Sequence, residues 1–286
     1  MEAPAPFEVR RGGAVLRGEE VGEGPPIVLA HGLTATRRYV VHGSNALPRA
    51  GFRLVSYDAR GHGESDPAGE ASGYVYPELA ADLAAVIDER AGDGPVVLAG
   101  HSMGTHTIAA LALERPERIA GVALIGPSSL GTPLPPDALD DWDALAAALE
   151  RGGVEEFVRV NENPALDDHW REVVARITRE RLNRHRHLDA VAEALREVPR
   201  SLPFDGLDEL VFLDVPALVV ASHDEADPGH PHAVAEAWAA RLPRARLVVE
   251  APGESPLAWQ GGKLSRELAA FCDQPEVRER MGDART

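Results

Sequence analysis

The sequence predicts an α/β protein with a mostly parallel eight-stranded sheet, flanked by helices and carrying an inserted helical cap. Short apolar runs alternate with segments of helical periodicity over residues 27–125, which is typical of parallel strands joined by crossover helices. One of these strands runs into a helix through Gly100-His101-Ser102-Met103-Gly104. Residues 127–213 then hold helical segments and no convincing strand, after which the alternation resumes.

The first half of the chain supplies most of the expected strands. Residues 7–21 alternate around Gly12-Gly13, which predicts an antiparallel hairpin with a tight turn. The wholly apolar runs that follow are typical of buried strands. In order, strands are expected at 27–30, 53–57, 95–99 and 119–125, and helices at 36–50, 76–90 and 105–114.

The strand ends predict where the site lies. Ligands of parallel sheets bind at the carboxyl ends of the strands. His31, Asp58 and Ser102 each follow such a strand directly, so we expect them at one edge of the sheet.

Residues 127–213 are expected to form the cap, inserted between two parts of the core at 1–126 and 214–286. Because the insertion follows the end of a strand, we expect the cap to cover the site. Its helices are expected at 138–149, 154–160, 168–182 and 188–198. The core then continues with strands at 217–221 and 246–250 and helices at 233–242 and 264–272.

Composition excludes several classes of function. The formal net charge of −17 argues against nucleic acid and anionic membranes as partners. The single cysteine, Cys272, excludes an internal disulfide and a cysteine zinc cluster. No apolar run approaches ~20 residues and no leader is evident, so a soluble, cytoplasmic protein is expected. We expect a small-molecule substrate, no metal and no cofactor; a homodimer is left open.

The serine at the tight turn is a candidate nucleophile. Glycines at 100 and 104 allow a turn so sharp that side chains there would clash. The turn holds the Ser102 oxygen at the end of its strand, beside the N-terminus of the next helix. Unpaired N–H groups at a helix N-terminus suit a developing oxyanion.

Three motifs together resemble the α/β-hydrolase superfamily, over nearly the whole chain. They are His31-Gly32, Gly61-His62-Gly63-Glu64-Ser65 and Gly100-His101-Ser102-Met103-Gly104.

This resemblance implies a role for several residues. Ser102 is the nucleophile, and the backbone N–H groups of Leu33 and Met103 form the oxyanion hole. By the same resemblance, His31 and His62 support loops and carry no proton. The helical insertion matches the cap of the family.

The resemblance also implies an acid and a base. Asp224 stands where the acid is expected, after the strand at 217–221, and Asp227 is the second choice. The base is expected after the strand at 246–250, but a glycine and Glu254 occur where a Gly-His pair is expected. No histidine follows His232.

Three hypotheses address the missing histidine. In the first, Glu254 acts as the base beside Asp224, with a pKa raised by burial and by its neighbour and an acid-shifted optimum. In the second, another histidine serves. In the third, the chain binds or rearranges a small ligand without hydrolysis. The histidines weighed for the second hypothesis are His106, His223, His230 and His232.

The function favoured by the sequence is that of a serine hydrolase, esterase-like, acting through an acyl-enzyme at Ser102. A small carboxylic ester, thioester or lactone is the expected substrate, and a serine at the turn argues against epoxide or haloalkane chemistry. Residues 171–200 are rich in arginine, including Arg181. That pattern fits either an anionic substrate or, as the favoured interpretation, a solvated helix face with i,i+4 ion pairs.

Overall fold

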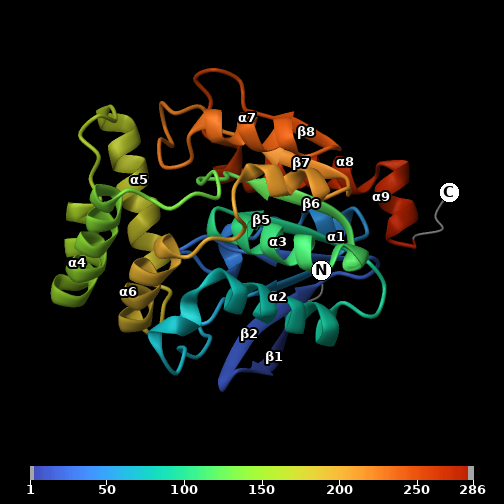
Figure 1. Ribbon diagram of the computed structural model, residues 1–286, viewed down its shortest axis with the longest axis horizontal. Helices are drawn as coiled ribbons and strands as arrows, with labels where there is room; N and C mark the ends of the chain where they lie inside the picture. Colours follow the sequence, from blue (N-terminus) through green and yellow to red (C-terminus); the bar gives the residue numbers. More distant parts are fainter. Residues whose placement is uncertain (1–2, 283–286) are drawn as a thin grey trace.

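One eight-stranded sheet runs through the computed structural model, which describes residues 3–282 (Figure 1). The strands lie in the order β1-β2-β4-β3-β5-β6-β7-β8. Their bounds are β1 Ala5–Arg11, β2 Ala14–Val21, β3 Pro26–Ala30, β4 Arg53–Tyr57, β5 Val96–His101, β6 Ile119–Ile125, β7 Ala217–Val220 and β8 Ala245–Val248.

The sheet is parallel except at one edge. Strands β1 and β2 pair antiparallel, and β2 pairs antiparallel with β4. Every other neighbouring pair is parallel. The predicted mostly parallel eight-stranded sheet and its opening hairpin are therefore confirmed.

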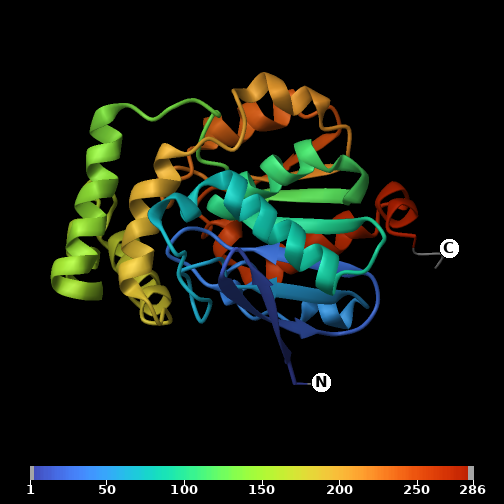
Figure 2. The ribbon, with the colours of Figure 1, turned by 60° about the horizontal axis from the view of Figure 1, so that its bottom comes forward.

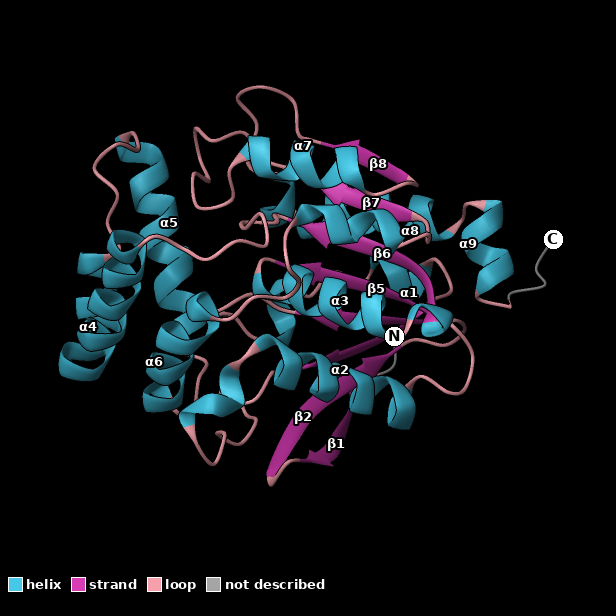
Figure 3. Ribbon diagram, in the orientation of Figure 1, coloured by secondary structure: helices cyan, strands magenta, loops and turns pink. Residues whose placement is uncertain are grey.

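Helices cover both faces of this sheet (Figure 3). Alternate residues of β3 show the two layers: Val28 packs into one apolar cluster with α2, α3 and α7, and Ile27 into another with α1, α8 and α9. This alternation is the period of two that a strand imposes. The α-helices are α1 Ala46–Arg49, α2 Tyr76–Arg90, α3 Met103–Glu114, α4 Pro136–Val160, α5 Asp168–Leu182, α6 Leu188–Glu197, α7 His232–Arg241, α8 Gly261–Cys272 and α9 Pro275–Arg280.

One predicted helical segment differs from the structure, and a second prediction is confirmed in detail. The helix expected at 36–50 is wrong: a 3-10 turn, Arg37–Tyr39, and the short α1 take its place. Gly43, at φ 70°, interrupts the segment. The two helices expected at 138–149 and 154–160 are both present within α4, because Gly153, at φ 64° and ψ −153°, leaves helical geometry and divides the element there.

Helices α4, α5 and α6, called the cap helices below, stand together at one side of the sheet (Figure 2). The arrowheads of the parallel strands point towards this side (Figure 3). The cap helices share a small apolar core that includes Leu149, Phe157, Leu182 and Leu195. They therefore stand beyond the strand ends, where the sequence places the site.

Among residues 3–282, no helix combines the length and the apolar character that crossing a bilayer requires.

Candidate active site

Ser102 occupies a strained turn between β5 and α3. Its backbone has φ 52° and ψ −116°, and positive φ is rare for residues other than glycine. The Ser102 N–H donates to the Ile125 carbonyl at 2.9 Å. The Thr105 hydroxyl lies 2.7 Å from the Gly100 carbonyl and 2.9 Å from that of Ile125. These bonds hold the turn against β6, so the strained serine has a fixed position.

Glycine is required on both sides of this turn. A Cβ on Gly104 would lie 2.1 Å from the Ala30 carbonyl oxygen, and one on Gly100 would lie 2.5 Å from the Gly104 backbone. Both distances are far inside van der Waals contact. The α3 backbone can therefore approach β3 and β5 this closely only because residues 100 and 104 carry no side chain.

A cavity of about 330 Å³ opens at Ser102 between the core and the cap helices. Leu33 and Met103 line it beside the serine. Within residues 3–282, neither of their backbone N–H groups has a hydrogen-bond partner. Two free donors beside a nucleophile are the arrangement that an oxyanion hole requires.

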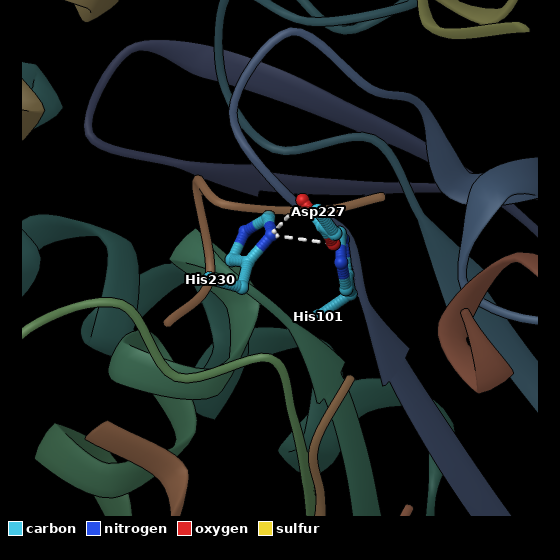
Figure 4. A group of neighbouring side chains, drawn as sticks. All are labelled: His101, Asp227 and His230. Carbon is cyan, nitrogen blue, oxygen red and sulfur yellow. Dashed lines mark hydrogen bonds and ion pairs between the residues drawn. The ribbon is translucent and has the colours of Figure 1, made fainter. Parts of the chain in front are cut away.

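His230 and Asp227 form a hydrogen-bonded pair in the loop between β7 and α7 (Figure 4). The His230 Nδ1 lies 3.0 and 2.9 Å from the two Asp227 oxygens. Because a carboxylate only accepts, Nδ1 carries the proton and Nε2 of the neutral ring keeps a lone pair. His230 lines the same cavity as Ser102.

The surroundings of Asp227 keep it ionised. Burial alone would raise the pKa of this carboxyl, but the hydrogen bond from His230 and the charge of Arg181 hold the pKa below its usual value. An ionised carboxylate at Nδ1 fixes the tautomer of the imidazole and stabilises its cation. The pair therefore has the form of a general base with its orienting acid.

The sequence-predicted acid and base lie elsewhere. The exposed Glu254 forms an ion pair of 2.5 Å with Lys263, which lowers the pKa of its carboxyl. A base at this position would need a raised pKa. The exposed Asp224 accepts the His232 N–H at 2.7 Å, at the start of α7. Neither residue lines the Ser102 cavity.

The structure therefore does not join Ser102, Glu254 and Asp224. The acid-shifted mechanism assigned to these three residues requires correction, because the Glu254 carboxylate faces solvent and an ammonium group. The acid weighed second, Asp227, and one of the alternative histidines, His230, are the groups that come together. An Asp-x-x-His spacing within one loop was the signal available for this pair.

The other histidines have structural contacts. His31 Nε2 accepts the Ala59 N–H at 2.9 Å, and His62 Nδ1 lies 3.0 Å from the Arg60 carbonyl, which agrees with their expected supporting role. His106 Nδ1 lies 2.9 Å from the Ser102 carbonyl, and burial lowers the pKa of its ring to about 4. His223 and His232 stack on each other, with centroids 5.7 Å apart.

His101 completes a small group with the pair (Figure 4). His101, Asp227 and His230 each offer one donor atom, and these atoms lie within 4.8 Å of one another. Burial lowers the pKa of His101 to about 3, so its ring is neutral. Neutral imidazoles with a carboxylate suit zinc and related metals. Such a cation would compete with the hydrogen bond that already joins two of these groups.

Residues 25–261 match the protein-family model described as alpha/beta hydrolase fold. The AB hydrolase superfamily protein YisY of Bacillus subtilis is 40% identical over 86 residues, 30% of this chain and 31% of that protein. The dihydrolipoyllysine-residue acetyltransferase component of the acetoin cleaving system of Pseudomonas putida is 31% identical over 199 residues. That alignment covers 69% of this chain and 50% of the relative, so the chain spans half or less of these two proteins.

A solved structure covers nearly all of the chain. The enol-lactonase from Burkholderia xenovorans LB400 superposes with a TM-score of 0.76 at 23% identity. The match covers 94% of this chain and 100% of the enol-lactonase. At 23% sequence identity, this similarity shows the fold alone.

Proposed function

The chain belongs to the α/β-hydrolase fold family, and we propose that it is a serine hydrolase with Ser102, His230 and Asp227 as its catalytic residues. Its substrate is a small carboxylic ester, thioester or lactone, cleaved through an acyl-enzyme. One observation carries this proposal: His230, held by Asp227, lines the cavity into which the strained Ser102 opens.

In the proposed first step, the Ser102 oxygen attacks the substrate carbonyl and its proton passes to Nε2 of His230. Asp227 stabilises the resulting imidazolium through Nδ1. The N–H groups of Leu33 and Met103 stabilise the oxyanion, typically by ~3–4 kcal/mol for each donor. The tetrahedral intermediate then collapses, its bond to the leaving oxygen or sulfur breaks, and His230 protonates the departing alkoxide or thiolate, which leaves an acyl group on Ser102.

In the second step, His230 takes a proton from water, and the hydroxide attacks the acyl carbonyl. The tetrahedral intermediate collapses, the acid is released, and the proton returns to the serine oxygen. The apolar part of the cavity, which includes Trp142, Leu145 and Phe157, holds the acyl chain. Closing these walls over the substrate excludes bulk water from the first step.

Labelling with a fluorophosphonate tests this proposal directly. We expect the wild-type chain to react at Ser102, S102A to remain unlabelled, and H230Q to react at least ~100-fold more slowly, because general-base assistance is lost. The hypothesis of a ligand-binding member without hydrolysis predicts no labelling of the wild type. A labelled protein that turns over no 4-nitrophenyl ester would contradict deacylation.

A further inference from the structure

One arginine of helix α5 differs from the other three in its ion pairing. The helix carries four, and three of them pair with carboxylates. The fourth, Arg181, lines the cavity at Ser102. The pairs are Arg171 with Asp168, Arg176 with Glu180 and Arg179 with Glu155.

Arg181 lacks such a partner. Within residues 3–282 its guanidinium has no ion pair, and its Nε is buried without a hydrogen bond. Among the described residues, Asp227 pairs with His230 and forms no ion pair with Arg181. Burial lowers the pKa of Arg181, and Asp227 and Tyr39 offset only part of this effect. An arginine keeps its charge even so, so a cation whose charge Asp227 offsets only in part lines the cavity.

The rest of the cavity wall makes this cation distinctive. The chain has 46 acidic residues and a net charge of −17, yet among residues 3–282 no Asp, Glu or Lys lines the cavity. Within that described part of the chain, Arg181 is the only Arg that lines it. The other walls are apolar side chains, three buried or partly buried histidines and neutral hydroxyl or amide groups. A desolvated cation without a partner is costly, and a bound anion would remove that cost.

We propose that Arg181 binds a carboxylate of the substrate, so that the enzyme acts on small esters or lactones that carry a second, free carboxylate. The planar guanidinium fork suits a carboxylate in a bidentate arrangement better than a single ammonium does. This inference rests on the proposed serine hydrolase for its substrate class. The binding of the carboxylate by Arg181 can be tested without turnover.

The kinetic test compares two esters of equal chain length, mono-4-nitrophenyl glutarate and 4-nitrophenyl pentanoate. In R181Q we expect KM for the glutarate ester to rise about 10- to 100-fold, the usual effect of losing a charge-assisted hydrogen bond. KM for the neutral pentanoate should change less than twofold, and R181K should recover part of the loss. R176Q is the matched control, because Arg176 pairs with Glu180 on the same helix.

The binding test uses glutarate itself, by calorimetry, with S102A and with S102A/R181Q. Binding to the first protein and not to the second supports the inference even where the wild type hydrolyses neither ester, a result that would contradict only the proposed hydrolase. Equal binding of glutarate to both proteins would overturn the inference. So would an equal rise in KM for both esters in R181Q.

Discussion

His230 and Asp227 lie three residues apart in one loop, and Nδ1 of His230 contacts both oxygens of the Asp227 carboxylate at 3.0 and 2.9 Å. The proposed acid and base thus follow the same strand, β7. The resemblance to the family places the base after the next strand, where this chain has Glu254.

Replacing each candidate base in turn distinguishes the hypothesis that His230 is the base from the hypothesis that Glu254 is. H230Q should lower kcat/KM for 4-nitrophenyl esters at least ~100-fold, because the proton of Ser102 then has no acceptor. E254Q should leave kcat/KM within twofold of the wild type, since Glu254 is exposed and paired with Lys263. Steady-state kinetics with both variants measures this. A large loss in E254Q with little loss in H230Q would restore the hypothesis based on the sequence.

Glu250 is predicted to position the catalytic loop. Its buried carboxylate accepts the His223 N–H at 2.7 Å and the Leu257 N–H at 2.9 Å. His223 begins the loop that carries Asp227 and His230. E250A should lower the free energy of unfolding by about 1–3 kcal/mol, because two buried donors lose their acceptor.

E250A should also lower kcat more than it raises KM, because the proposed base, His230, loses its position while the cavity walls remain. Urea unfolding and ester kinetics measure the two effects. E250Q keeps one amide oxygen and should recover part of both. A loss of stability in E250A with an unchanged kcat would mean that Glu250 acts on the fold alone.

Gly104, two residues after Ser102, gives a prediction about stability. G104A should destabilise the protein by at least about 1–3 kcal/mol, because its Cβ would lie 2.1 Å from the backbone oxygen of Ala30. G94A is the control, since a Cβ on Gly94 meets nothing within 4 Å. Urea titration of both variants measures the difference. Equal midpoints would show that α3 can move away from β3 at low cost.

Zinc should inhibit the enzyme, and metal removal should not. His101, Asp227 and His230 offer three donor atoms within 4.8 Å, so a bound zinc would take the base and its acid together. We expect inhibition by added Zn²⁺, its reversal by EDTA, and unchanged activity after dialysis against EDTA alone. Loss of activity on that dialysis would assign a catalytic role to the metal instead.

The sequence predicted the sheet and the tight turn at Ser102 because both depend on local patterns. Apolar runs define the strands, and the two glycines define the turn at Ser102. The proposed base, His230, differs from the predicted one, Glu254, for another reason: chain order places the base after β8, but its function requires only proximity to Ser102. The Lys263 partner of Glu254 stands nine residues further along the chain, and only the folded loop brings the two together.

The segment expected to form one helix at 36–50 does not do so, for a similar reason. Its apolar residues have helical spacing, but Gly43 adopts a positive φ and the chain turns there. The unpaired state of Arg181 also depends on tertiary structure. The sequence favours solvated ion pairs for the whole arginine-rich segment, and three arginines of α5 do form ion pairs. The fourth arginine, Arg181, differs from these three because it lines the cavity at Ser102.

Buried neutral histidines predict how stability depends on pH. His62 and His106 are 1% exposed, and burial lowers the pKa of each ring to about 4. The unfolded chain binds these protons near pH 6.5, and the folded chain binds them only near pH 4. Stability is therefore complete above about pH 6.5 and falls as the pH drops towards 4, by about 1.4 kcal/mol per pH unit for each ring.

Urea unfolding at pH 7, 6 and 5 measures this dependence. Between pH 6.5 and 5 each ring should contribute a loss of about 2 kcal/mol. H62Q and H106Q should each make the dependence shallower by one such contribution, whatever their stability at pH 7. H169Q, which removes an exposed histidine, is the matched control. A slope that H62Q and H106Q do not alter would mean that other groups control the acid sensitivity of the fold.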